Sequence, residues 1–195
     1  LNLPGLHNVR NALAAIACAH EVGVSDIAIA RALSGFSGID RRFQMQTLLT
    51  AQGEFLHIDD YAHHPQEIAA VLQAIREGWP TRRLVVAFQP HRFTRTFDLF
   101  DDFVQVLAEI EVLLLFNVYA AGEAPIAGAT SEALCQAIQA KGQVKPQLVA
   151  SIEQLPHSLS LLLQNQDILL TLGAGSIGAV AAILSNEFSY RSSEK

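Results

Sequence analysis

The chain has 195 residues, of which half are apolar and 16% are charged. This composition excludes disorder over most of the length and predicts a substantial core, in one large domain or in one domain joined to part of another. The formal net charge of −6 argues against a general nucleic-acid surface, which needs an excess of Lys and Arg on one face. We therefore expect no nucleic-acid partner.

No segment has the features of a signal peptide or a membrane span. The alanine-rich stretch at residues 12–19 is too short to cross a bilayer, and polar or charged residues flank it. Cys18 and Cys135, the only cysteines, each lie in a helical apolar pattern that favours buried, reduced thiols, as in a cytosolic protein. Because the chain begins on Leu1 and not on Met, we expect it to be part of a longer protein.

The first 37 residues predict two helices. Residues 7–21 place apolar side chains on one face, and Ser25 is a suitable N-cap for a second helix that ends near Gly35. A glycine-rich break follows, and the pattern then changes character. We predict a domain boundary there, with residues 1–37 in one domain and residues 38–195 in another.

The second domain alternates between strands and helices. Short, continuous apolar runs at residues 84–88 and 112–117 predict strands that are buried on both faces of a parallel sheet. The first two strands, residues 43–49 and 54–59, are expected to form a hairpin across Ala51-Gln52-Gly53. The alternation predicts an α/β fold with a Rossmann-like, doubly wound, mostly parallel sheet and one antiparallel edge strand. Further strands are expected at residues 146–150 and 168–172, and helices at residues 68–75, 97–107, 130–141, 151–163 and 177–184.

Two polar clusters follow successive strands at strand-to-helix turns. Residues 59–65 read Asp-Asp-Tyr-Ala-His-His-Pro, and residues 89–96 read Gln-Pro-His-Arg-Phe-Thr-Arg-Thr. Ligand sites of parallel α/β sheets lie at this end of the strands, so we predict that the two turns are adjacent and form one site. Asp59 and Asp60 leave an extended backbone in opposite directions, so only one of them can face that site.

The side chains of these turns suit a bound anion better than a metal ion. His63, His64 and His91 have no cysteine or second carboxylate at a ligand spacing, so we favour hydrogen bonds to substrate. Arg92 and Arg95 lie three residues apart at a helix start, where they can grip a carboxylate or a phosphate. The alternative is a surface pair that binds the aspartates among residues 98–102.

Residues 173–178, Gly-Ala-Gly-Ser-Ile-Gly, match the G-x-G-x-x-G pattern of dinucleotide sites. That pattern belongs to a first βαβ unit, whereas here it closes the last one. We therefore favour a tight turn with close helix packing and reject an NAD-dependent oxidoreductase. The G-x-x-x-x-G-K-[ST] loop that cradles nucleotide phosphates does not occur in these 195 residues.

Several motifs resemble, in order and spacing, the final part of the Mur ligases of peptidoglycan synthesis. They are GLHNVRNALAA (5–15), GIDRRF (38–43), DDYAHHP (59–65), FQPHRFTRT (88–96), NVYAAGE (117–123) and LGAGSIG (172–178). The resemblance covers nearly the whole chain and is nearest to the members that join L-alanine to UDP-N-acetylmuramate. It implies that residues 1–37 end a central ATP-binding domain and that residues 38–195 form the Rossmann-like C-terminal domain.

The resemblance also implies a bacterial cytoplasmic enzyme that uses ATP and Mg²⁺. Such enzymes activate a muramoyl carboxylate as an acyl phosphate, which the amine of L-alanine then attacks. The implied partners are UDP-N-acetylmuramate, L-alanine, ATP and the N-terminal and central domains, which would carry the phosphate loop and most magnesium ligands. The 195 residues alone are expected to be inactive, and no membrane partner is expected.

Roles pass to this sequence only where its motifs match those of the family. The resemblance implies adenine contacts from Asn8 and Asn11, an ATP-phosphate contact from Arg42, and a bond from Asp60 to the ribose hydroxyls. A second group would bind L-alanine and the acyl phosphate by positioning and charge neutralisation: Tyr61, His63, His91, Arg92 and Arg95. The expected catalytic residues are Arg42, His63, Arg92 and Arg95, and none of these residues is expected to bind a metal.

Two positions depart from the family pattern. Asn117 and Ser176 stand where relatives often carry Asp, so the contacts to the amine stay unassigned and no general base is named. The nearest alternative function is a ligase that returns murein tripeptide to UDP-N-acetylmuramate, which would need a roomier site. The alternative of another class is a stand-alone α/β binding module without catalysis.

Overall fold

The structure is a computed structural model that describes residues 3–36, 38–50, 53–142 and 144–190. Its strands are β1 (Gln44–Thr50), β2 (Gly53–Asp60), β3 (Leu84–Phe88), β4 (Val112–Phe116), β5 (Gln147–Val149), β6 (Ile168–Leu172) and β7 (Ser189–Tyr190). Its α-helices are α1 (Leu6–Glu21), α2 (Asp26–Gly35), α3 (Pro65–Gly78), α4 (Phe93–Asp98), α5 (Phe100–Leu107), α6 (Ser131–Ala140), α7 (Leu155–Leu162) and α8 (Val180–Glu187). Two 3-10 turns are η1 (Ile152–Gln154) and η2 (Ser176–Ala179).

The strands form one sheet in the order β5-β4-β3-β6-β2-β1-β7. Strands β2 to β6 run parallel to one another, whereas β1 is antiparallel to both β2 and β7. The predicted Rossmann-like, doubly wound, mostly parallel fold is therefore confirmed. The short β7 was not predicted, and it places β1 one strand in from the edge.

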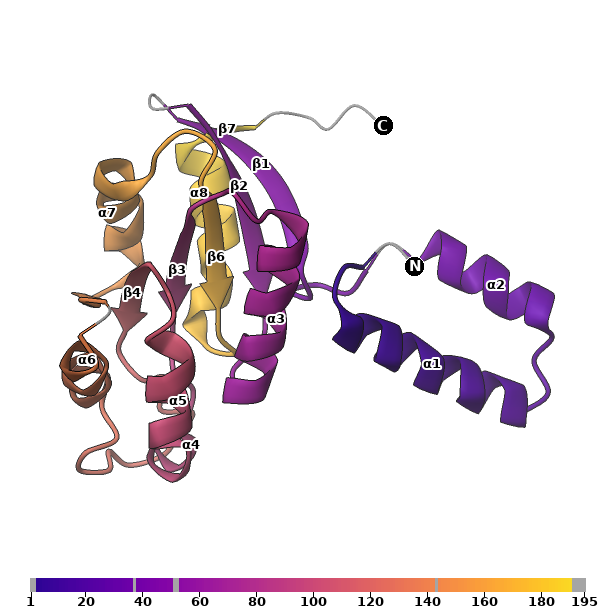
Figure 1. Ribbon diagram of the computed structural model, residues 1–195, viewed down its shortest axis with the longest axis horizontal. Helices are drawn as coiled ribbons and strands as arrows, with labels where there is room; N and C mark the ends of the chain where they lie inside the picture. The colour runs from indigo at the N-terminus through magenta and orange to yellow at the C-terminus, as the bar shows by residue number, and fades with distance from the viewer. Residues whose placement is uncertain (1–2, 37, 51–52, 143, 191–195) are drawn as a thin grey trace.

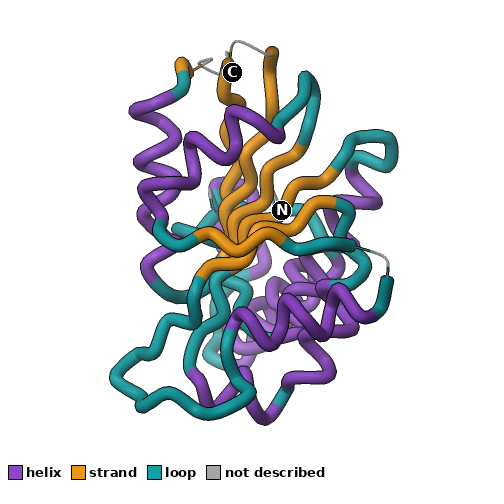
Figure 2. Tube along the Cα trace, turned by 90° about the vertical axis from the view of Figure 1, so that its left-hand side faces the viewer, coloured by secondary structure: helices purple, strands orange, loops and turns teal. Residues whose placement is uncertain are grey.

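Helices cover both faces of the sheet (Figures 1 and 2). One face packs against α3, α5 and α6 through side chains such as Val86 and Leu170, and the other packs against α7 and α8 through side chains such as Val85 and Leu169. Successive residues of a strand point to opposite faces. This two-sided burial explains why the central strands are continuous apolar runs rather than alternating ones.

Helices α1 and α2 form a hairpin that projects away from the sheet (Figure 1). Neither helix contributes a buried residue, and large apolar side chains such as Leu13 and Ile27 are exposed at 59% and 76%. The prediction that both cysteines are buried is wrong for Cys18, which is exposed on α1 because this helix packs against little of the described chain. Cys135 is half-buried.

The predicted bounds hold best where local sequence decides them. Strands β3 and β6 have the predicted bounds, and Ser25 and Thr130 cap α2 and α6 through their side chains. The helix predicted at residues 97–107 instead begins at Phe93 and is interrupted at Leu99. Within the predicted hairpin turn and the predicted domain break, residues 51–52 and Ser37 lie outside the described residues.

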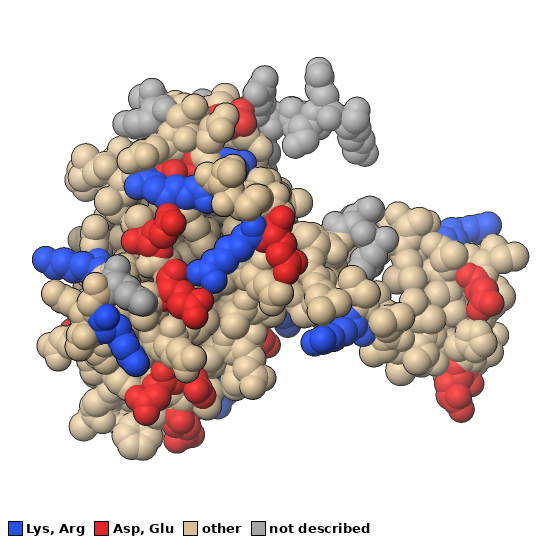
Figure 3. Space-filling view, in the orientation of Figure 1, with Lys and Arg blue, Asp and Glu red and all other residues tan. Residues whose placement is uncertain are grey.

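Charges of both signs are interspersed over the face of the described residues shown in Figure 3. Among the described residues, no helix combines the length and apolar character that a membrane crossing requires.

Candidate functional site

A cleft of about 880 Å³ separates the α1–α2 hairpin from the start of α3. It is lined by all four residues that the sequence assigned to ATP: Asn8, Asn11, Arg42 and Asp60. Asn8 and Asn11 lie three residues apart on α1 and so share one face of the helix. The sequence motifs at residues 5–15, 38–43 and 59–65 therefore converge on one hollow.

Asp60 fixes the backbone at the floor of this cleft. Its Oδ2 accepts a hydrogen bond from the amide of Phe43 at 2.8 Å, and its Oδ1 accepts one from the amide of Ala62 at 2.8 Å. Burial raises the pKa of the Asp60 carboxyl, although the two amide bonds oppose the shift. Each oxygen keeps a further lone pair, so the carboxylate can still accept one bond from a ligand.

The second part of the 59–65 turn starts helix α3. His64 is the N-cap, its ring accepts a hydrogen bond from the amide of Gln66, and Glu67 accepts bonds from the amides of His63 and His64. This capping box satisfies amides that the first helical turn leaves free. His64 therefore serves as a helix cap, whereas the ring of His63 faces the turn after β3.

The turns after β2 and β3 meet through their side chains. The ring of His63 lies 5.4 Å from that of Tyr61 and 5.9 Å from that of His91, measured between centroids. Arg95 donates from Nη1 to the backbone carbonyl of His91 at 3.1 Å. The structure therefore brings together Tyr61, His63, His91 and Arg95, which we call the imidazole–guanidinium cluster.

The two turns meet as predicted although their strands are not neighbours in the sheet, because β6 lies between β2 and β3. The turn after β6 is the glycine segment 173–178, and its small residues let the flanking turns approach each other above it. A Cβ on Gly173 would lie 2.6 Å from the carbonyl oxygen of Gln89, and a Cβ on Gly175 would lie 2.7 Å from Cβ of Tyr119.

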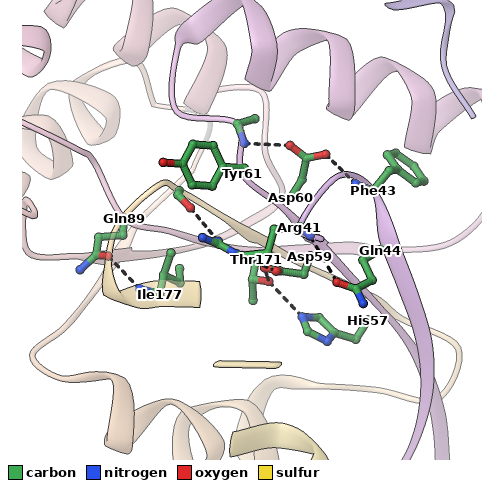
Figure 4. A network of polar contacts seen from close by, with 12 residues as sticks. Arg41, Phe43, Gln44, His57, Asp59, Asp60, Tyr61, Gln89, Thr171 and Ile177 are labelled. Atoms are coloured by element: carbon green, nitrogen blue, oxygen red, sulfur yellow. Dashed lines mark hydrogen bonds and ion pairs between the residues drawn. The ribbon is translucent and has the colours of Figure 1, made fainter. Parts of the chain in front are cut away.

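The side chain of Gln89 also occupies this glycine turn. Its Oε1 accepts a hydrogen bond from the amide of Ile177 at 2.9 Å (Figure 4). Its Nε2 donates to Ser176 Oγ at 3.0 Å. The turn is therefore packed against other parts of the chain, as the packing interpretation of the G-x-G-x-x-G pattern predicts. Ser176, one of the two departures from the family pattern, belongs to this packing.

Arg92 is the most open member of the predicted group, with its side chain exposed at 52%. It adopts a φ of 73° directly before α4, and its Nη1 lies 3.7 Å from Oε1 of Glu123. Glu123 also accepts hydrogen bonds from the amide and hydroxyl of Thr94, at 3.0 and 2.8 Å. The bond from the Thr94 amide is the main cause that lowers the pKa of Glu123.

The surroundings of His91 favour its neutral imidazole form. Burial lowers the pKa of His91, and the positive charge of Arg95 lowers it further. Tyr119 stacks on its ring at 5.4 Å with an interplanar angle of 13°, and the backbones of the two residues form an isolated parallel bridge. His91 can therefore donate or accept a hydrogen bond without carrying charge.

Three further residues at this site were not among the predicted site residues: Arg41, Tyr119 and Glu123. The guanidinium carbon of Arg41 lies 5.4 Å from the Tyr61 ring centroid, and that of Arg42 lies 5.7 Å from it. The signals were present, because Arg41 stands in GIDRRF and the other two in NVYAAGE. Only the structure shows that residues 119–123 lie beside the turn after β3.

No group of three His, Cys, Asp or Glu side chains in the described part of the chain is arranged to hold a metal ion. The histidines instead contact Tyr61, Tyr119 and Arg95. The imidazole and guanidinium side chains of this cluster are groups that can bind a small anion.

A family profile described as "Mur ligase, glutamate ligase domain" matches residues 41–175. The chain is 55% identical over 182 residues to a UDP-N-acetylmuramate–L-alanine ligase of Methylococcus capsulatus, covering 93% of this chain and 39% of that relative. A solved UDP-N-acetylmuramate–alanine ligase from Thermotoga maritima matches with a TM-score of 0.74 at 29% identity, over 96% of this chain and 39% of that one.

A murein peptide ligase from Psychrobacter arcticus matches with a TM-score of 0.66 at 25% identity, over 93% of this chain and 37% of that one. The chain therefore spans about two fifths of the length of these relatives. The profile match covers more than half of the chain, and it lies on the sheet that carries the imidazole–guanidinium cluster. The chain belongs to the Mur ligase family.

Proposed function

We propose that the chain forms the C-terminal part of an ATP-dependent ligase that joins L-alanine to UDP-N-acetylmuramate through an acyl phosphate. One observation carries the proposal: Arg42 lines the cleft and also lies 5.7 Å from Tyr61, the first member of the imidazole–guanidinium cluster. A phosphate held by Arg42 would therefore stand at the border between the cleft and the cluster. This is the place where an acyl phosphate has to form and react.

The cleft suits the adenosine end of ATP. The side-chain amides of Asn8 and Asn11 can both donate to and accept from the edge of a base. Asp60 would accept a bond from a ribose hydroxyl with the lone pairs that its two amide bonds leave free. Arg42 would contact the phosphates, because a guanidinium presents paired donors to phosphate oxygens.

The cluster, together with Arg92 beside it, suits the amino acid and the reacting anion. Arg92 and Arg95 would neutralise the carboxylate of L-alanine and the acyl phosphate, while Tyr61, His63 and His91 would hold them by hydrogen bonds. These side chains are already held by their neighbours, so little reorganisation is needed when charge develops in the transition state. Their proposed roles are positioning and charge neutralisation, and none attacks the substrate.

The reaction that we propose uses Mg²⁺, but the described residues do not offer a fitting site for it. Magnesium prefers oxygen ligands in near-octahedral geometry, and no suitable group occurs among them. We therefore expect its ligands mainly in other parts of the enzyme and assign it no step here.

The proposal also places the enzyme in the bacterial cytoplasm.

The domain assignment is part of the same proposal. Residues 1–37 would end the central ATP-binding domain, and residues 38–195 would form the C-terminal domain. Two observations support it: the family profile begins at residue 41, and helices α1 and α2 bury no residue of their own. A helical hairpin with exposed apolar side chains gains stability only when further protein covers it.

The test is a product assay with the full-length protein, UDP-N-acetylmuramate, ATP and Mg²⁺. We expect formation of the L-alanyl product together with ADP and phosphate when L-alanine is supplied. Murein tripeptide serves as the competing acceptor. Product from the tripeptide but not from L-alanine would assign the recycling reaction instead, and no product from either would leave a binding module.

A further inference from the structure

Arg42 lies between two residues with unusual backbone conformations. Arg41 has a φ of 57° and Phe43 a φ of 52°. Residues other than glycine rarely occupy this left-handed region, and they stay there only when their surroundings hold them. The direction in which Arg42 leaves the backbone is therefore set by whatever fixes its two neighbours.

The consecutive carboxylates of β2 hold both neighbours. Asp60 accepts the amide of Phe43, as described above, and the amide of Tyr61 donates to the carbonyl oxygen of Arg41 at 2.7 Å. Asp59 points to the other side of the strand, where its Oδ2 accepts a hydrogen bond from Nε of Arg41 at 2.9 Å (Figure 4). Asp59 and Asp60 are 2% and 3% exposed, so water competes little for these bonds.

A chain of hydrogen bonds connects Asp59 to Thr171, His57 and Gln46. The hydroxyl of Thr171 donates to Asp59 Oδ1 at 2.6 Å, and His57 Nε2 lies 3.0 Å from the same hydroxyl oxygen. Because the only hydroxyl proton goes to Asp59, the Thr171 oxygen accepts from His57 Nε2–H. His57 Nδ1 then accepts from Nε2 of Gln46 at 2.7 Å. Each group in the chain has one defined role.

The protonation of His57 fits this direction. Burial lowers the pKa of His57 from 6.5 to about 4, and the negative charge of Asp59 offsets this only in part. A neutral ring with its proton on Nε2 is the form that can accept from Gln46 and donate to Thr171. His57 and Thr171 are 1% and 0% exposed.

The far end of the Arg41 side chain is fixed by the glycine turn. Arg41 Nη2 donates to the carbonyl oxygen of Gly173 at 2.6 Å. A Cβ on Gly178 would lie 2.8 Å from Arg41 Nη1, so the third glycine of the G-x-G-x-x-G pattern makes room for this guanidinium. The glycine turn therefore completes the support of Arg41.

We propose that His57, Thr171 and Asp59 are positioning residues that act through Arg41 to orient Arg42 toward the cleft. The part that concerns ATP rests on the proposed function. The three residues lie on β2 and β6, whereas Arg42 precedes β1. Their hydrogen bonds therefore connect the segment before β1 to two central strands. The three residues would orient Arg42 and do not contact the reacting atoms.

Three variants of the full-length protein separate positioning from bulk stability. Thr171→Val keeps the shape of the side chain and removes the hydroxyl, Thr171→Ser restores the hydroxyl, and Thr81→Val is an exposed control at the opposite end of the sheet. We expect Thr171→Val to raise the KM for ATP about fivefold and to leave the KM for L-alanine within about twofold. Thr171→Ser and Thr81→Val should both stay close to the unmodified protein.

A rise in both KM values, or a failure of Thr171→Ser to restore the KM for ATP, would overturn the proposal. A second readout does not depend on the reaction: the Nε–H signal of Arg41 in nitrogen-15 NMR spectra of the 195-residue chain, assigned with Arg41→Lys. The signal should exchange slowly in the unmodified chain and in Thr171→Ser, and rapidly in Thr171→Val. Slow exchange in Thr171→Val would overturn the proposal even if the full-length protein proved to be no ligase.

Discussion

The imidazole rings of His63 and His91 lie 5.9 Å apart, although they follow strands β2 and β3 that are separated by β6. Their approach is possible because the intervening turn contains glycines at positions where a Cβ would collide with Gln89 or Tyr119. The two polar turns that stand out in the sequence thereby form one surface.

Replacing Arg92 tests the exposed cation that adjoins the cluster. Arg92→Ala in the full-length enzyme should raise the KM for L-alanine and lower kcat, since a charge-assisted contact is worth roughly 1.5–3 kcal/mol. Steady-state kinetics with varied L-alanine measures this effect. Arg76→Ala, which removes an exposed cation paired with Glu109 on another surface, is the matched control. Unchanged kinetics in Arg92→Ala would mean that Arg92 is an ordinary surface residue.

The 195-residue chain should not hydrolyse ATP by itself. The G-x-x-x-x-G-K-[ST] loop and its lysine are absent from these residues, so the β and γ phosphates lack their main ligands. Phosphate release from a highly purified preparation, compared with a buffer blank, checks this expectation. Turnover that survives further purification and is lost in Arg42→Ala would show that these residues suffice for ATP chemistry.

Protonation of His57 should limit stability in acid. The unfolded ring binds a proton near its ordinary pKa of 6.5, whereas burial lowers the pKa of the folded ring to about 4. Between these two pKa values the unfolded state therefore binds more protons than the folded state. The contribution of His57 to the free energy of unfolding is complete above pH 6.5 and falls as the pH drops toward 4. The total loss from this residue should be about 3 kcal/mol.

Urea unfolding of the unmodified chain and of His57→Gln between pH 4 and 7 isolates this contribution, because other groups such as Asp59 and Asp60 remain in both proteins. The difference in unfolding free energy between the two should shrink as the pH falls. His157→Gln changes an exposed histidine and serves as control. An NMR titration that placed the pKa of His57 near 6.5 would refute the expectation directly.

The glycine turn should tolerate a methyl group poorly. In Gly175→Ala the new Cβ would lie 2.6 Å from Gln89 Oε1 and 2.7 Å from Cβ of Tyr119. Overpacking of this kind typically costs about 1–3 kcal/mol. At Gly35 an added Cβ would meet nothing within 4 Å, so Gly35→Ala should change the stability by less than about 0.5 kcal/mol. Equal unfolding free energies for the two variants would show that the turn is not tightly packed.

Local sequence predicts those parts of the fold that depend on local physics. Strands β3 and β6 are short apolar runs because both of their faces are buried, and the hydroxyls of Ser25 and Thr130 cap helices through their own chain neighbours. The start of α4 at Phe93 lies before the predicted start at residue 97. The amide of Thr94 in its first turn donates to Glu123, which lies 29 residues further along the chain. No local pattern contains such a contact.

The candidate site likewise combines features that local sequence predicts with features that depend on distant contacts. The clusters at residues 59–65 and 89–96 were visible as unusual densities of polar side chains. The place of β6 between their strands was not, because strand order depends on crossovers that local periodicity does not record. The contacts of Arg41 could not be predicted, since they involve Asp59 on β2 and Gly173 after β6, which lie far from it in the sequence.

The most direct test of the account is a crystal structure of the full-length protein with UDP-N-acetylmuramate and a non-hydrolysable ATP analogue. We predict the base against Asn8 and Asn11 in the cleft, and the terminal phosphate beside Arg42 on the side of Tyr61 and His63. A nucleotide bound instead at the glycine turn of residues 173–178, or with its phosphates directed away from Arg42, would contradict the account.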